Sequence, residues 1–170
     1  MLEHVLENIP DFYKPYVTRV KFETPVEALF QDFEDICALF NQLTPEQQEY
    51  RYAEGKWTPK QIVQHVMDSE RILSQRALRF SRKDMTQLPG FDHDAYVEVA
   101  DVSHRTMAEL IEEFRTVRQS TILLYKSFTE KMLKREGFAN GMVLSVENQG
   151  LVIAGHLLHH VNVLKERYLV

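Results

Sequence analysis

The chain has 170 residues, of which 44% are hydrophobic and 26% are charged, and these values are typical of one globular domain. Its net charge is −5, and it lacks the clustered basic face that binding to a phosphate backbone requires, so no nucleic acid partner is expected. No apolar run approaches the ~20 residues that a membrane-spanning helix needs, which argues against a membrane partner.

The single cysteine, Cys37, excludes a disulfide framework and fits a reducing compartment. It falls among Phe33, Ile36 and Phe40, where a small buried thiol is expected. The first residues are acidic and contain no apolar segment of the signal-peptide type. We therefore expect a cytoplasmic protein.

A first long helix is predicted over residues 25–42. Thr24 offers a capping side chain, Pro25 takes the first helical position and Glu27 takes the third. The apolar residues that follow recur at helical spacing: Leu29, Phe30, Phe33, Cys37 and Phe40.

Three further long helices have start signals of the same kind. A capping box that begins at Thr58 predicts a second helix over 59–82. Another, at Thr106, opens a third helix, and Ser145 caps a fourth helix that ends near Tyr168. The hydrophobic pattern between these signals is helical throughout.

Shorter helical turns are expected at 10–20, 45–50 and 130–135, and no segment is predicted as a strand. No repeat, low-complexity tract or flexible linker divides the chain. We therefore predict a single domain over 1–170, with a core from about 20 to 170. Four long amphipathic helices predict an all-α four-helix bundle.

The segment 84–104 is long for a connection between bundle helices. The second helix, of about 24 residues, is about 36 Å long, and about twenty extended residues at ~3.3 Å each can cross that length. The third helix would then begin at the same end as the second, which gives an up-down-down-up order. A lid is the alternative for this segment.

Histidines crowd into the last helix as His156, His159 and His160. At 100° per residue, His156 lies within about 40° of His160, whereas His159 lies about 100° away. Residues four apart have Cβ atoms ~5–6 Å apart, so both imidazoles can reach one ion at ~2.0–2.1 Å. His65, on the inward face of the second helix, lies at a height that matches them if those two helices are antiparallel.

Inward histidines are also common as hydrogen-bonded core residues, so spacing alone leaves a metal site and an ordinary core open. Three histidines on core-facing stripes favour the metal site, because buried polar groups rarely lack partners. The segments Lys56–His65, Asp68–Arg71, Phe91–Tyr96, Ala154–His160 and Lys165–Tyr168 resemble those of the DinB/YfiT-like superfamily. The resemblance extends over about 20–170.

The resemblance implies an up-down-down-up four-helix bundle that binds one divalent metal ion, zinc or nickel, through His65, His156 and His160. It also implies a small-molecule substrate, because relatives transfer low-molecular-weight thiols or are classed as metal-dependent hydrolases. We therefore expect a metal-dependent hydrolase or thiol S-transferase, with a low-molecular-weight thiol as a candidate cofactor. The alternative is a non-enzymatic, metal-stabilised bundle that acts in stress response or interaction. A homodimer is left open.

Three imidazoles leave a metal ion with open coordination positions, as catalytic sites do. Candidate proton-transfer residues are Asp92, Asp94 and Tyr96 on the 84–104 segment, although aspartates after Pro-Gly are also ordinary turn residues. Arg76 and Arg167 follow the two histidine stripes and are candidate ligands for an anionic substrate. Buried ion pairs with Asp or Glu are the alternative for both arginines.

Overall fold

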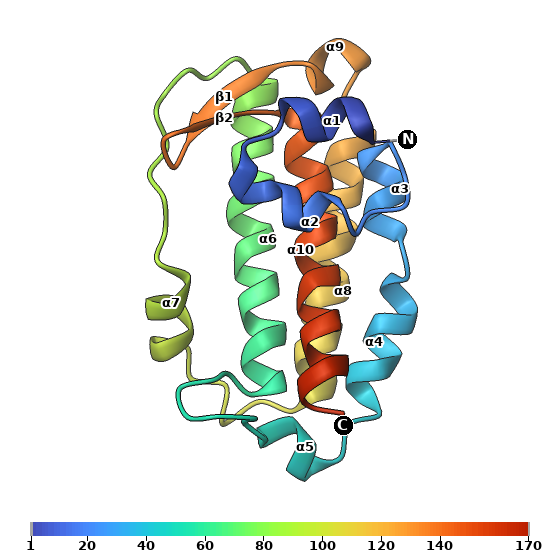
Figure 1. Cartoon of the computed structure of the whole chain (residues 1–170), viewed down its shortest axis with the longest axis vertical. Coiled ribbons are helices and arrows are strands. Elements are labelled where there is room, and N and C mark those ends of the chain that lie inside the picture. The colour runs from blue at the N-terminus through green and yellow to red at the C-terminus, as the bar shows by residue number, and fades with distance from the viewer. Residues whose placement is uncertain (1, 170) are drawn as a thin grey trace.

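The computed structural model describes residues 2–169, most of which lie in helices packed side by side (Figure 1). The long arms are α3 Pro25–Phe30 continued by α4 Phe33–Asn41, α6 Pro59–Ser81, α8 Met107–Lys126 and α10 Val146–Arg167. The short elements are α1 Glu3–Asn8, the 3-10 turn η1 Asp11–Tyr13, α2 Lys14–Val17, α5 Pro45–Glu49, α7 His93–Val99, α9 Glu130–Leu133, β1 Glu136–Ala139 and β2 Met142–Ser145. The predicted all-α four-helix bundle is confirmed.

Helices α6 and α8 run in the same direction, and α10 and the α3–α4 arm run in the opposite one (Figure 1). Arg105, just before α8, donates to Gln64 near the start of α6 (3.1 Å), and Arg118 donates to Glu70 further along both helices. At the end of α10, the Tyr168 hydroxyl donates to a carbonyl just before α6. The segment that carries α7 runs along the bundle to join the two parallel helices.

The predicted start of each arm is confirmed by its capping side chain. The Thr58 and Thr106 hydroxyls each accept from the amide three residues on, and both capping boxes are complete. Thr24 and Ser145 make the same kind of bond at the starts of α3 and α10. Such caps typically contribute about 1 kcal/mol each, and they depend only on neighbouring residues.

The first predicted helix is interrupted, which corrects the continuous helix expected over 25–42. Gln31 leaves the helical conformation, and Asp32 takes a left-handed one with φ of 53°. The break frees the carbonyl of Leu29, which accepts from Arg118 (2.7 Å). The Gln31 side chain in turn accepts from the amide of Lys21 (2.8 Å). Long-range hydrogen bonds therefore replace the local ones.

The strands β1 and β2 form an antiparallel hairpin, so the prediction of no strand was wrong for 136–145. Asn140 and Gly141 form its turn, with φ of 53° and 72°, and Asn-Gly is the favoured pair where both turn residues need positive φ. Gly137 packs on α6, since an added Cβ would lie 1.9 Å from the ring of Phe80. The helices α1 and α7 were also not predicted.

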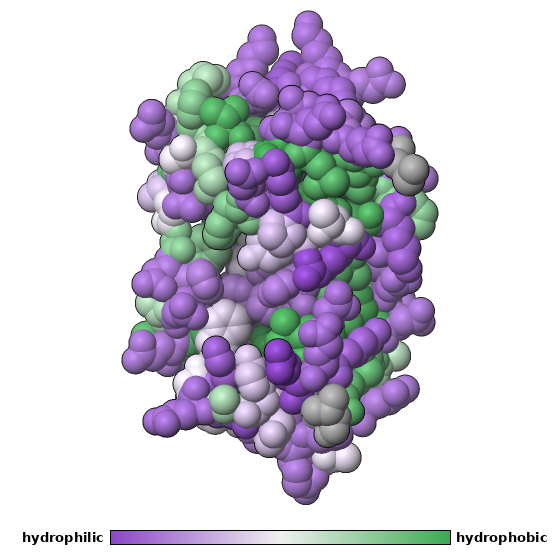
Figure 2. All heavy atoms as spheres, in the orientation of Figure 1, coloured by the Kyte–Doolittle hydropathy of each residue, from purple (hydrophilic) through white to green (hydrophobic). Residues whose placement is uncertain are grey.

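Two apolar clusters fill the bundle, one at each end. The cluster at the hairpin end includes Leu29, Phe80 and Leu151, and the other includes buried Cys37 and Phe114. Between them, α6, α8 and α10 contribute a layer of polar side chains that contains Ser69, Glu70, Arg118 and His156. Hydrophilic residues cover most of the face in Figure 2. No helix within residues 2–169 is long and apolar enough to cross a membrane.

Candidate metal centre

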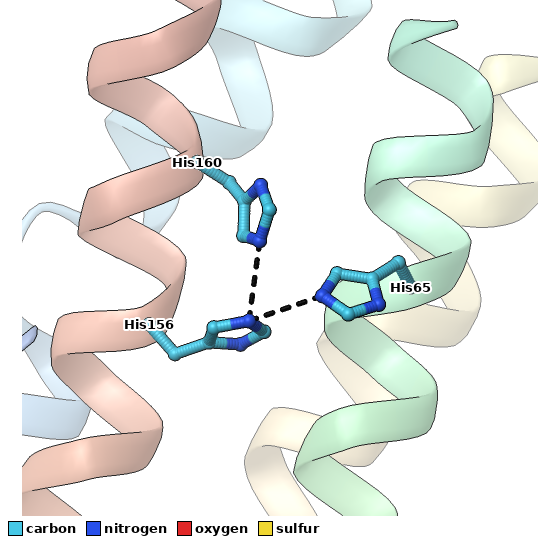
Figure 3. A group of neighbouring side chains, drawn as sticks. All are labelled: His65, His156 and His160. Carbon is cyan, nitrogen blue, oxygen red and sulfur yellow. Dashed lines mark hydrogen bonds between the residues drawn. The ribbon is translucent and has the colours of Figure 1, made fainter. Parts of the chain in front are cut away.

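Histidines from the two longest helices meet in the polar layer. His65 extends from α6 toward His156 and His160 of α10 (Figure 3). Nε2 of His156 lies 3.1 Å from Nε2 of His65 and 3.1 Å from Nε2 of His160. Candidate ligand nitrogens of all three lie within 4.8 Å of one another. The pairing that the sequence predicted across α6 and α10 is therefore present in the geometry.

This arrangement fits a metal ion better than a hydrogen-bonded core. Nitrogen ligands of tetrahedral zinc at ~2.0–2.1 Å are about 3.3 Å apart, close to the two 3.1 Å separations. An imidazole nitrogen carries either one proton or one lone pair. Nε2 of His156 can therefore satisfy only one of its two neighbours by hydrogen bonding. An ion that accepts a lone pair from each ring would satisfy all three.

The electrostatics of the cluster favour neutral imidazoles, the form that binds metals. Burial, with smaller contributions from His93 and His159, lowers the pKa of His65 to about 3. Burial also lowers the pKa values of His156 and His160 well below their ordinary value, and the neighbouring histidines lower them further. At neutral pH these three rings carry no charge.

His159 lies on the flank of α10, as the angular argument predicted. It is not a member of the three-histidine cluster found among residues 2–169. Its ring meets the edge of Tyr16 at 5.5 Å, and its buried Nδ1 has no hydrogen-bond partner in that part of the chain. His104 is exposed before α8 and is also outside the cluster.

The N-terminal segment forms a wall of the centre, although the predicted core began only at about residue 20. The ring of Tyr16 meets that of His156 edge-on at 5.4 Å. Close packing of α2 on α10 positions this ring, since a Cβ added to Gly155 would lie 2.2 Å from the Tyr16 carbonyl oxygen. The sequence pattern of the short helix α2 does not indicate which long helix it packs against, so its position on α10 was not predicted.

A cavity of about 420 Å³ adjoins the three histidines. Aromatic side chains line much of it: Phe12, Tyr13, Tyr16, Trp57 and Phe91. The Trp57 ring lies 4.6 Å from that of His65 and is stacked on that of His160 at 5.9 Å. This volume suits a small organic molecule, because ligand pockets typically hold about 300–1,000 Å³.

The candidate proton-transfer residues Asp92, Asp94 and Tyr96 do not line this cavity, and their catalytic role stays a prediction. The Asp92 carboxylate caps α7 by accepting from the amides of Asp94 and Ala95 (3.1 Å each). The Tyr96 ring is 46% exposed and packs on Phe91. Asp94 lines a neighbouring pocket, and His160 of the cluster lines the same pocket. Formation of α7 therefore places Asp92 and Tyr96 away from the cavity and leaves Asp94 beside it.

His93 is the residue that the sequence analysis missed. Its ring lies 5.8 Å from that of His65 and 6.1 Å from that of Trp57, and it lines the cavity. An Asx cap at Asp92 would have predicted a helix starting at His93, but this aspartate was considered only as an acid or a turn residue.

The two candidate anion-binding arginines differ. Arg76 is buried, lines the cavity and donates to the carbonyl of Pro89 (2.8 Å). Arg167 is exposed and does not line the cavity. At that end of α10 the inward position is taken by Tyr168, which is 7% exposed. Arg167 therefore lies away from the cavity, while Arg76 lines it.

The fold and the site define a four-helix bundle with a three-histidine centre beside a cavity. The family model of the DinB superfamily matches residues 29–164, and the chain belongs to this superfamily. The matched region includes all three clustered histidines but not the N-terminal segment.

YfiT from Bacillus subtilis, described as a probable metal-dependent hydrolase with an unusual four-helix bundle topology, has a similar structure, with a TM-score of 0.64. The two proteins are 20% identical over 83% of this chain and 86% of YfiT. The curated proteins contain no match to this chain.

Proposed function

We propose that His65, His156 and His160 bind one divalent transition-metal ion, zinc or nickel, and that the protein is a metal-dependent hydrolase of a small molecule. The observation that carries this proposal is the convergence of three neutral imidazole nitrogens beside a cavity. Imidazole suits zinc and nickel, whereas magnesium and calcium prefer oxygen ligands. YfiT, which is described as a probable metal-dependent hydrolase, supports hydrolysis by analogy of fold.

The ligand set supports an open, catalytic site. Structural zinc sites use four side chains, whereas catalytic sites use three and leave a position free. The cluster among residues 2–169 contains three histidines, with no cysteine or carboxylate. Cys37 belongs to an apolar cluster, and burial raises the pKa of its thiol to about 11. When bound, an ion would supply Lewis-acid activation of a water or a thiol.

The surrounding side chains would orient the substrate and move protons. Tyr16 and Trp57 pack against the histidine rings and shield them from bulk water. We propose His93 as the proton-transfer group at the rim. The Asp94 carboxylate lies 3.8 Å from Nε2 of His93, beyond hydrogen-bond length. The single buried cysteine supports a reducing, cytoplasmic location.

Metal analysis with activity assays tests the proposal. We expect about one zinc or nickel ion per purified chain, and hydrolysis of a panel of esters and amides that stops on chelation and returns with the metal. A parallel assay with a small thiol and a model electrophile separates thiol transfer from hydrolysis. Stoichiometric metal without either activity would instead support a metal-stabilised bundle. Absence of bound metal would refute the proposal.

A further inference from the structure

The cavity beside the histidines has an unusual charge balance. Although the chain carries a net charge of −5, none of the described side chains that line the cavity is acidic. Arg76 contributes a positive charge, since guanidinium groups stay protonated in proteins. Neutral imidazoles would leave a bound divalent ion with its own charge uncompensated. An anionic ligand would supply the missing negative charge.

Arg76 has the hydrogen-bonding capacity for such a ligand. It is 4% exposed, and its one hydrogen bond within residues 2–169 runs from Nη2 to the carbonyl of Pro89. A guanidinium has five N–H donors, so most of its donors remain available. Burial lowers the pKa of Arg76, with only Tyr13 acting in the opposite direction. No carboxylate of the described chain compensates this charge.

Ser69 is a second unpartnered polar group on the same wall. It is 2% exposed, and its buried Oγ has no hydrogen-bond partner within the described chain. Ser69 and Arg76 both line the cavity, on the face of α6 that carries His65. Eleven residues separate His65 from Arg76, which is three helical turns with about 20° left over and about 16 Å of rise. The cavity therefore has one reactive end and one cationic end.

We propose that the substrate is an elongated small molecule with an oxyanion, a carboxylate or phosphate, at one end. Arg76 binds this oxyanion and the reacting group lies at the three histidines, while Ser69, one turn of α6 from His65, offers its hydroxyl to the part of the molecule between them. Leu73, Phe91 and Val152 line the cavity and contact the apolar part of the molecule. This inference rests on the proposed metal-dependent function. The planar guanidinium favours paired hydrogen bonds to carboxylate or phosphate oxygens.

Paired hydroxamic acids provide the test, because hydroxamates chelate zinc. Alkyl hydroxamates of graded length are prepared with either a terminal carboxylate or a terminal carboxamide, and their affinities for the zinc-loaded full chain are measured by calorimetry. At the best length we expect the carboxylate to bind about 10- to 100-fold more tightly than the amide, as charge-assisted hydrogen bonds predict. Arg76→Gln should remove this preference, because it should weaken binding of the carboxylate far more than binding of the amide.

Matched variants assign the effect. Ser69→Ala should weaken the two probes to a similar extent, and Arg76→Lys should retain part of the preference for the carboxylate. Arg167→Gln, which removes an exposed arginine outside the cavity, should change neither affinity. The wild-type comparison needs no variant, so the preference remains measurable even if Arg76→Gln fails to fold.

The outcomes separate the two proposals. Zinc-dependent binding of both probes with equal affinity would overturn the oxyanion subsite and leave the metal centre intact. A carboxylate preference that persists undiminished in Arg76→Gln would also overturn it. Binding that does not depend on zinc, or no binding of either probe, would overturn the metal centre and the inference that rests on it.

Discussion

Helix α6 carries polar side chains on two faces, and the two faces differ in how those side chains are satisfied. Toward α8, the Glu70 carboxylate accepts three hydrogen bonds from Arg118, which also donates to Leu29 and lies over the ring of Phe33. Toward α10, His65 meets two other imidazoles, and Ser69 and Arg76 retain unused donors. The polar groups of the first face are satisfied within the chain, whereas the second face retains unpaired donors among residues 2–169.

The contrast distinguishes two uses of buried polar groups. A fully hydrogen-bonded buried pair orients helices, and its loss should appear as lost stability. Buried polar side chains that converge without hydrogen-bond partners in the chain can bind a ligand, and their replacement should appear as lost ligand binding. The predictions below test this distinction, from the largest expected effect to the smallest.

The largest expected effect is on metal binding. His65→Ala, His156→Ala and His160→Ala should each abolish stoichiometric binding of zinc or nickel, because each variant keeps only two of the three imidazole ligands. Without metal, His156→Ala should lose stability mainly through the lost packing of the ring against Tyr16, because only one of its two Nε2 contacts can be a hydrogen bond. With metal, wild type should gain about 4 kcal/mol at a free metal concentration 1,000-fold above Kd.

Controls for this experiment are His159→Ala, His93→Ala and His104→Ala, which should keep one ion per chain by metal analysis. Loss of the ion from His159→Ala with retention by His160→Ala would contradict the choice of ligands.

On the face toward α8, Glu70→Gln should destabilise the protein by about 3–5 kcal/mol, because it leaves the buried Arg118 cation without a counter-charge. Urea unfolding of the metal-free protein measures the loss. Glu34→Gln removes a carboxylate from an exposed ion pair with Arg115 and should cost no more than about 1 kcal/mol. If Glu70→Gln and Glu34→Gln lowered the free energy of unfolding equally, the buried Glu70–Arg118 pair would not have the expected stabilising role.

Acid should destabilise the metal-free protein through the histidine face. Burial lowers the folded-state pKa of His65 to about 3, and those of His156 and His160 are also lowered. The unfolded-state value is about 6.5, so the unfolded chain binds more protons below that pH. Stability changes little above pH 6.5 and falls as the pH drops toward about 3, and His65 alone contributes about 1.4 kcal/mol of this loss at pH 5.5.

Unfolding midpoints measured between about pH 8 and pH 5 test this pH dependence. His65→Asn should flatten the profile, and bound zinc should move the loss to lower pH. A wild-type profile that does not change between pH 6.5 and 5 would contradict neutral histidines in the folded state.

The smallest effect concerns the wall formed by α2. Gly155→Ala places a Cβ against the Tyr16 carbonyl and should cost about 1–3 kcal/mol from overpacking, partly offset by about 1 kcal/mol of helix propensity. Hydrogen exchange should rise in residues 2–20 and change little in α6. Gly150→Ala, whose Cβ would meet Tyr125 and Pro25, should leave exchange in α2 unchanged. Equal exchange in both variants would refute the specific role of Gly155.

Features that depend on neighbouring residues could be predicted from the sequence. The cap at Thr58 and the four-residue spacing of His156 and His160 are local, and both the helix start and the shared face of the two rings were predicted correctly. The Asn140-Gly141 turn was equally local, and the sequence analysis missed it although its signal was present.

Features that depend on distant residues could not be predicted. The break at Gln31 is stabilised by an arginine almost ninety positions along the chain, and no local pattern indicates it. By helical spacing, Arg76 shares a face with His65, and Arg167 shares a face with His160 equally well. Only packing distinguishes them, because Tyr168 fills the inward position beside Arg167. The role of Asp92 was missed because a single residue type serves as both acid and helix cap.

The close approach at Gly155 has a consequence for protein engineering. The three clustered histidines lie on α6 and α10, whereas Tyr13 and Tyr16, which line the cavity, come from a short leading segment docked on α10. The two contributions are separable along the chain. Chimeras that exchange residues 10–18 and keep Gly155 would thus form a library in which the pocket shape varies around a constant set of histidines.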